Sequence, residues 1–297
     1  MNNTVLDAGI ARHLAEAHLD ASAVATLLKL TIAEDLADGV DVTSVATVPE
    51  QQLSVLDLVA RQPGVTAGVW VAAAVFDLVT DHDATIEVHI EDGSDVNVGD
   101  VLISITGHTR DLLVGERTAL NFFGHLSGVA TATHAWAVQL EGTGARVRDT
   151  RKTMPFLRAL EKYAVRCGGG VNHRMSLSDA ALVKDNHIVA AGGVRQAFEA
   201  VRTTFPGIPV EVEVDTLDQL REVLDAGADL VLLDNFTCAQ MRDAVAVNAG
   251  RATLEASGGL TLDNAAEVGR TGVDYIAVGA LTHSAHVLDI GADLRAL

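Results

Sequence analysis

The chain has 297 residues, 48% of them hydrophobic, and a formal net charge of −19 at pH 7. A chain of this length can bury a full core, and its two cysteines are too few for a disulfide framework, so we expect free, buried thiols. The strong negative charge argues against nucleic acid or an anionic membrane as a partner, and the polar N-terminal stretch leads us to expect a cytoplasmic protein.

The N-terminal 127 residues are predicted to form an α+β domain. Residues 23–36 (AVATLLKLTIAEDL) and 68–80 (GVWVAAAVFDLVT) repeat apolar side chains at helical spacing. Residues 85–90 and 91–107 instead indicate strands joined by Asp-Gly and Gly-Asp turns. We therefore expect a sandwich of helices on a β layer.

A long helical pattern over residues 115–140 predicts a helix that connects this domain to the next. Gly124 and Gly128 predict an interruption of that helix. We place the domain boundary after residue 127. At the other end of the chain, residues 283–297 are expected to form a helix that packs with the N-terminal domain.

Residues 128–282 alternate short apolar runs with helix-like stretches, a pattern typical of βα units around a parallel sheet. The expected strands are 145–150, 180–186, 208–215, 228–235, 252–258 and 273–279, and the expected helices between them are 154–165, 194–205, 216–227, 238–249 and 262–272. A complete eightfold barrel needs about 250 residues. Six units in this shorter stretch predict an α/β fold with an incomplete parallel β/α barrel.

Every expected barrel strand ends in polar or small residues. In chain order they are Asp149 to Lys152, Lys184 to Asn186, Glu213 and Asp215, Asp234 and Asn235, Ser257 to Gly259, and Gly279 and Ala280. Because active sites of β/α barrels lie at the C-terminal ends of the strands, these residues predict one site. Cations come from the first two units, carboxylates from the middle two and glycine turns from the last two.

This order of charges suits a phosphorylated sugar beside a polyanion. Arginine and lysine bind carboxylates and pyrophosphate, and a glycine turn at a helix N-terminus presents backbone N–H groups to phosphate. Glu213 and Asp234 have the oxygens to accept hydrogen bonds from sugar hydroxyls, or to hold magnesium together with phosphate oxygens. His283 and His286 are spaced like a metal pair, but without a third ligand nearby we expect them on a helix surface.

Several segments of the chain resemble the quinolinate phosphoribosyltransferases, which are type II phosphoribosyltransferases. They are ERTALNFFGHLSGVAT (116–131), DTRKTMPFLRALEKYAVRCGGGVNHRMSLSDAALVKDNH (149–187), EVEVD (211–215), VLLDN (231–235), EASGG (255–259) and DYIAVGALTHSA (274–285). The resemblance covers nearly the whole chain. It implies a reaction of quinolinate with phosphoribosyl pyrophosphate and magnesium that gives nicotinate mononucleotide, pyrophosphate and CO2 in NAD biosynthesis.

The resemblance also implies which residues bind each substrate. Quinolinate would be bound by Arg117, Thr150, Arg151, Lys152, His173, Arg174 and Lys184, and phosphoribosyl pyrophosphate by Glu213, Asp234, Ser257, Gly258, Gly259, Val278, Gly279 and Ala280. The catalytic residues would be Lys152, Lys184, Glu213 and Asp234. Magnesium would enter with the substrate, with Glu213 and Asp234 as the candidate protein ligands.

The resemblance also implies a homodimer with shared active sites, or a higher oligomer, in which the N-terminal layer covers the partner's barrel, so Arg117 would reach the neighbouring site. Phe156, Ser176 and Val40 depart from the family pattern, which has glycine there or usually shows it. None of these departures removes a charged ligand, so they concern loop detail.

Two alternatives remain open. The first is a related phosphoribosyltransferase for another heterocyclic acid, and the pair of Arg151 and Arg174, which suits two carboxylates, weighs against it. The second is a phosphosugar-binding barrel without transfer activity. The separation of the cations from the glycine turns weighs against that alternative, because a phosphosugar alone needs no second anion site.

Overall fold

The computed structural model describes residues 5–297, which form two compact units. The first unit comprises the chain up to Ala132, the segment Met154–Gly169 and the C-terminal segment Ser284–Leu297. The second unit comprises Thr133–Thr153 and Gly170–His283. The segment 154–169, which the sequence pattern placed in the barrel, therefore belongs to the first unit.

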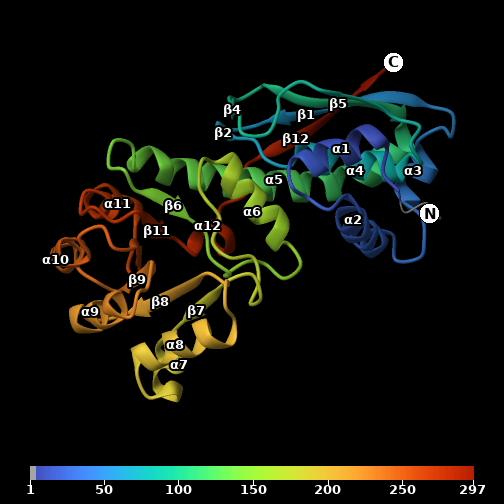
Figure 1. Cartoon of the computed structure of the whole chain (residues 1–297). Helices are drawn as coiled ribbons and strands as arrows, with labels where there is room; N and C mark the ends of the chain where they lie inside the picture. Colours follow the sequence, from blue (N-terminus) through green and yellow to red (C-terminus); the bar gives the residue numbers. More distant parts are fainter. Residues whose placement is uncertain (1–4) are drawn as a thin grey trace. The chain divides into compact units, whose positions relative to one another are not determined.

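The first unit contains a four-stranded antiparallel sheet in the order β12-β1-β5-β3 (Figure 1). Its strands are β1 (Leu53–Ala60), β3 (Thr85–Val88), β5 (Val101–His108) and β12 (Ile290–Ala296), and β2 (Gly64–Val65) pairs separately with β4 (Asp95–Val96). Leu56, Leu58, Ile103 and Ile105 are buried at alternate positions of β1 and β5. This alternation supplies one apolar face for the core of the unit.

Helices complete the core of the first unit. They are α1 (Ala8–Glu16), α2 (Ala21–Leu36), α3 (Val42–Thr47), α4 (Val69–Val79), most of α5 (Thr109–Gln139), and α6 (Arg158–Cys167). The α4 helix packs against β5, and α1 and α2 pack against α4. Because α4 is apolar on nearly every side, from Val69 to Leu78, it can be buried among all of them.

The C-terminal segment corrects one sequence prediction. Residues 283–297 were expected to form a helix, but Ile290–Ala296 form strand β12, which pairs antiparallel with β1. Ala60 lies opposite Ile290, and Ser54 lies opposite Ala296. The pairing joins segments more than two hundred residues apart, so a local pattern of seven residues could not reveal it.

The long connecting helix corrects a second prediction. Gly124 and Gly128 do not interrupt α5, which is continuous from Thr109 to Gln139. A Cβ atom on Gly128 would lie 2.1 Å from the carbonyl oxygen of His286, and one on Gly124 would lie 2.9 Å from that of Leu288. The glycines therefore allow the backbone that leads into β12 to pass close to the helix.

The second unit is a six-stranded, wholly parallel sheet in the order β6-β11-β10-β9-β8-β7 (Figure 1). Its strands are β6 (Arg146–Arg148), β7 (Ala181–Val183), β8 (Val210–Val214), β9 (Leu230–Asp234), β10 (Thr253–Ser257) and β11 (Tyr275–Ala277). The first strand, β6, pairs with the last, β11, whereas β6 and β7 stand at the two ends of the strand order. This is the predicted incomplete β/α barrel.

Helices follow the barrel strands. They are α7 (Asp185–Ala191), α8 (Val194–Thr204), α9 (Leu217–Asp225), α10 (Cys238–Asn248), α11 (Leu262–Gly269) and the short α12 (Ala280–His283). The side chains of Thr216, Thr237 and Thr261 cap α9, α10 and α11, which fixes where each helix begins after its strand. The helix α7 was not predicted, because the expected strand 180–186 ends early, at Val183.

Two smaller findings complete the description. Cys167 and Cys238 are free thiols, as expected, but each is half-buried. Between residues 5 and 297, every helix is too short or too polar to cross a lipid bilayer.

Candidate active site

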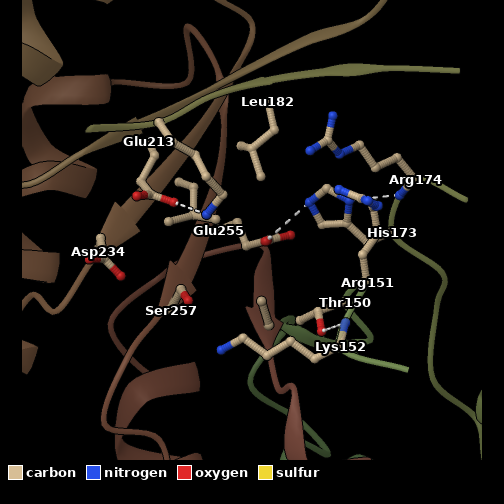
Figure 2. Close-up of a pocket in the computed structure, with 13 residues that line it drawn as sticks. Thr150, Arg151, Lys152, His173, Arg174, Leu182, Glu213, Asp234, Glu255 and Ser257 are labelled. Atoms are coloured by element: carbon tan, nitrogen blue, oxygen red, sulfur yellow. Dashed lines mark hydrogen bonds and ion pairs between the residues drawn. The ribbon is translucent and has the colours of Figure 1, made fainter. Parts of the chain in front are cut away.

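The C-terminal ends of the barrel strands surround a cavity of about 440 Å³ in the second unit (Figure 2). Its walls are formed by Thr150, Arg151, Lys152, His173, Arg174, Leu182, Lys184, Glu213, Leu232, Asp234, Glu255, Ser257 and Ala277. The structure thus brings together cations that follow β6 and β7 with carboxylates from β8 and β9. Figure 2 shows the arginines and His173 on one side and Asp234 with Ser257 on the other.

A second cavity, of about 390 Å³, adjoins the first. Its walls include Ser257 to Leu260 after β10 and Ala277 to Ala280 after β11. Thr150, Lys152 and Asp234 line both cavities, so the two spaces share a wall. The predicted cation cluster and the predicted glycine turns therefore face parts of one elongated site.

The turn after β10 has the backbone geometry expected for binding phosphate. Gly258 and Gly259 have φ angles of +88° and +62°, and a Cβ atom on Gly258 would lie 2.1 Å from the Asn235 Oδ1 atom. Glycine is therefore required at position 258. The turn leads into α11, where Thr261 is the N-cap, so backbone N–H groups are available to an anion.

At the other end of the site, Arg151 and Arg174 present hydrogen-bond donors. The Nε atom of each is buried and has no hydrogen-bond partner within residues 5–297, whereas Arg174 Nη1 donates to the Ala180 carbonyl at 2.9 Å. Burial lowers the pKa of Arg174, and the positive charge of Arg151 lowers it further. Two like charges held together, with unused donors, fit a ligand that carries two carboxylates.

Between these two ends, a cation and a carboxylate meet. Lys184 Nζ donates to Glu213 Oε2 at 2.6 Å, and the Lys184 side chain keeps 46% of its surface exposed (Figure 2). The resemblance assigns Lys184 to the acid and Glu213 to the sugar, and the structure pairs these two side chains with each other. Asp234 Oδ2 accepts a hydrogen bond from Asn235 Nδ2 at 2.7 Å and faces both cavities.

The model of the quinolinate phosphoribosyl transferase N-terminal domain matches residues 41–127, and that of the C-terminal domain matches residues 129–293. The chain belongs to the quinolinate phosphoribosyltransferase family. The resemblance stated from the motifs is confirmed, and with it the expected class of fold.

Relatives of the family match along most of the chain. The nicotinate-nucleotide pyrophosphorylase [carboxylating] of Mycobacterium leprae is 50% identical over 271 residues, which cover 90% of this chain and 95% of that protein. The probable enzyme of the same name from Bacillus subtilis is 39% identical and covers 90% and 92%. The crystal structure of NadC from Streptococcus pyogenes has a TM-score of 0.89 and 40% identity, and covers 92% and 97%.

The family motif also bears on two predicted positions outside the cavity walls. Arg117 is exposed on α5, in the first unit, and it lines neither cavity. Phe156, which stands where the family pattern has glycine, has a φ angle of +65° and is 92% exposed. The backbone there keeps the left-handed conformation that favours glycine, although the side chain is aromatic.

The structure adds a positioning contact to the role that the resemblance implies for His173. It lines the cavity and is buried, but its Nδ1 atom accepts the backbone N–H of Arg174 at 2.7 Å. Its Nε2 atom lies 2.7 Å from Glu211 Oε2. Both ring nitrogens therefore face protein groups, and His173 holds the backbone that carries Arg174.

Sequence reasoning missed Glu255 and Glu211, which lie inside β10 and β8. Glu255 lines the cavity, and Arg148 Nη1 donates to its Oε2 atom at 2.7 Å. Both carboxylates are buried. The available signal was a charged residue in the middle of a short parallel strand, where an apolar side chain is usual.

Proposed function

We propose that this enzyme transfers the phosphoribosyl group of phosphoribosyl pyrophosphate to the ring nitrogen of quinolinate, with loss of one carboxylate as CO2. The other products are nicotinate mononucleotide and pyrophosphate. The reaction is a step in NAD biosynthesis. The observation that carries the proposal is the pair Arg151 and Arg174, whose buried Nε atoms have no hydrogen-bond partner among residues 5–297, in a cavity that adjoins the one beside the glycine turn. The names of the relatives agree with this activity.

The two substrates bind at opposite ends of the site, because the groups at those ends suit different anions. The carboxylates of quinolinate bind Arg151 and Arg174, and the 5′-phosphate binds the backbone N–H groups around Gly258. Glu213 and Asp234 lie between these ends and accept hydrogen bonds from the ribose hydroxyls. This arrangement holds the ring nitrogen near the anomeric carbon, which lowers the barrier by fixing proximity and orientation.

The transfer step places positive charge on the sugar and negative charge on the leaving group. As the bond from the anomeric carbon to pyrophosphate breaks, Lys152, which lines both cavities, stabilises the departing diphosphate. The new carbon–nitrogen bond leaves the ring nitrogen cationic. The adjacent carboxylate then leaves as CO2, and the electron pair that remains on the ring carbon takes up a proton.

We propose magnesium as the cofactor, carried to the site by the diphosphate oxygens of the substrate. The site fits this arrangement because magnesium needs only one or two protein carboxylates when phosphates and water complete its shell. Glu213 is already paired with Lys184. Because this ion pair occupies the Glu213 carboxylate, the metal is best supported as part of the substrate complex.

A direct assay tests the reaction and the first alternative. Purified protein is mixed with phosphoribosyl pyrophosphate, magnesium and either quinolinate or nicotinate, and nicotinate mononucleotide is measured by chromatography. We expect product from quinolinate and at least about tenfold less from nicotinate, because nicotinate lacks the second carboxylate. Equal use of both acids would contradict the assignment of two arginines to two carboxylates, and no product from either would support a barrel that only binds.

We further propose that the enzyme works in the cytoplasm as a homodimer with shared sites. Arg117 supports this, because the resemblance assigns it to the substrate although it lines neither cavity of its own chain. Subunits carrying Arg117→Ala and Lys184→Ala should restore about a quarter of full activity after random exchange, since half the dimers are mixed and each has one intact site. If mass spectrometry confirms exchange and no activity returns, Arg117 acts within its own subunit.

A further inference from the structure

A group of charged residues is buried beneath the end of the cavity that holds Arg174. Three carboxylates take part: Glu255 and Asp149 are 0% exposed and Glu211 is 2% exposed. The positive charge comes from Arg148, and His173 lies among them. These five residues, here called the buried cluster, come from β6 and the residue after it, from β8 and β10, and from the segment after Val171, all in the second unit.

The carboxylates of the buried cluster differ in how many of their oxygens accept hydrogen bonds. Asp149 accepts the His173 backbone N–H at 2.8 Å and Asn172 Nδ2 at 2.6 Å. Glu255 Oε2 accepts from Arg148. Among residues 5–297, Glu255 Oε1 and both oxygens of Glu211 have no hydrogen-bond partner of acceptable geometry, although His173 Nε2 lies 2.7 Å from Glu211 Oε2. Buried oxygens of this kind are costly unless a donor is supplied.

His173 cannot supply the missing positive charge. Its Nδ1 atom accepts the N–H of Arg174, so this nitrogen carries no proton, and the ring is neutral with its proton on Nε2. With all three carboxylates ionised, the buried cluster would hold three negative charges against the single positive charge of Arg148. That excess would lie directly beneath a site for a ligand that is itself a dianion.

One proton on Glu255 removes much of this conflict. It lowers the negative charge and turns the unsatisfied Oε1 atom into a donor. Burial first, and the negative charge of Glu211 second, raise the pKa of Glu255 to about 8, while Arg148 opposes the shift. Figure 2 shows the Glu255 carboxylate between the His173 ring and Glu213, and Glu255 lines the cavity.

We propose that Glu255 is a positioning residue whose carboxyl group holds a proton while quinolinate is bound, so that binding of the acid takes up a proton from alkaline solution. The inference rests on the proposed function, because it takes the dianion as the ligand above the cluster. A dianion placed beside Glu255 favours its neutral form further. The protonated group keeps Glu211, His173 and the Arg174 backbone in one arrangement without repelling the substrate.

Isothermal titration with quinolinate alone tests this proposal. Runs at pH 8.5 in two buffers of different ionisation enthalpy give the number of protons taken up on binding. We expect uptake of up to one proton by the unmodified enzyme, and a Kd that rises by up to tenfold per pH unit above the pKa of Glu255. In Glu255→Gln the uptake and the pH dependence should disappear, while the Kd at pH 6.5 stays within about threefold because Gln mimics the neutral acid.

Two further variants make the result specific. Glu213→Gln alters the carboxylate paired with Lys184 in the same cavity. Whatever its effect on quinolinate affinity, the number of protons taken up per quinolinate bound should persist. Glu211→Gln removes the neighbouring negative charge, so the pH at which uptake is half-maximal should fall, and this variant replaces Glu255→Gln if that protein does not fold. Uptake that persists in Glu255→Gln, or disappears in Glu213→Gln, overturns the proposal.

Three side chains of the buried cluster also have the spacing of a metal site. Ligand atoms of His173, Glu211 and Glu255 lie within 4.8 Å of one another. Elemental analysis of the purified enzyme distinguishes the two roles. One metal ion per chain that is lost in Glu211→Gln would overturn the proton-holding role. If the unmodified enzyme fails to bind quinolinate at all, the proposed function fails. Binding without proton uptake defeats only this inference.

Discussion

Replacement of Arg174 by alanine should weaken quinolinate binding by about 10- to 150-fold. The side chain is anchored by one hydrogen bond, from Nη1 to the Ala180 carbonyl, and its Nε donor is unused. A carboxylate that loses a charged partner loses about 1.5–3 kcal/mol, which corresponds to that range of Kd. Removal of Arg174 also relieves its repulsion with Arg151, so the remaining arginine limits the loss.

The assay is isothermal titration of quinolinate and of nicotinate into each variant, with circular dichroism to confirm the fold. Arg174→Lys serves as the matched control, because it keeps the positive charge and loses the planar fork, and it should fall between the other two proteins. The loss should be larger for quinolinate than for nicotinate. An unchanged quinolinate Kd in a folded Arg174→Ala protein would refute the assignment of Arg174 to a carboxylate.

Three further predictions address other parts of the site. Asp234→Asn should raise the KM for phosphoribosyl pyrophosphate by about tenfold or more, with quinolinate Kd little changed; loss of quinolinate affinity instead would reverse the assigned ends. Gly258→Ala should impair use of phosphoribosyl pyrophosphate in steady-state assays, since a Cβ 2.1 Å from Asn235 Oδ1 at φ +88° costs about 1–3 kcal/mol. Between pH 4.5 and about 8, the folded protein keeps a proton on Glu255 that the unfolded chain has already lost. The free energy of unfolding therefore falls as the pH rises through this window, by up to about 1.4 kcal/mol per pH unit. Urea titrations of Glu255→Gln should show a weaker fall.

The barrel was predictable because its signals are local. Each strand is a short apolar run that ends in a polar residue or glycine, and several of the following helices have a threonine cap that marks their start. The first unit was harder to predict. Strand β1 received no prediction, and β12 was expected to be a helix, because their pairing joins residues more than two hundred positions apart. A hydrogen-bonded partner that distant leaves no trace in local periodicity.

The candidate site also has features that the sequence predicts and features that it does not. Residues at the ends of strands were found, because topology alone brings them together. Contacts between them were not found: the spacing of Lys184 and Glu213 does not say that they form an ion pair at 2.6 Å. Glu211 and Glu255 lie within strands rather than at their ends, so the rule that located the site passed over them.

The placement of charge explains how a chain of net charge −19 can bind two anions. Its overall field repels them, but at physiological salt that field is screened beyond about 8 Å. An anion in the cavity lies closer than this to the groups of the cavity walls, which include Arg151, Arg174 and Lys152. The Gly258 turn adds backbone donors that carry no net charge. The carboxylates beneath Arg174 would repel the bound anions if all of them were ionised. Protonation of Glu255 reduces this repulsion, and the arginines above it supply the attraction, so both serve the binding of the anion.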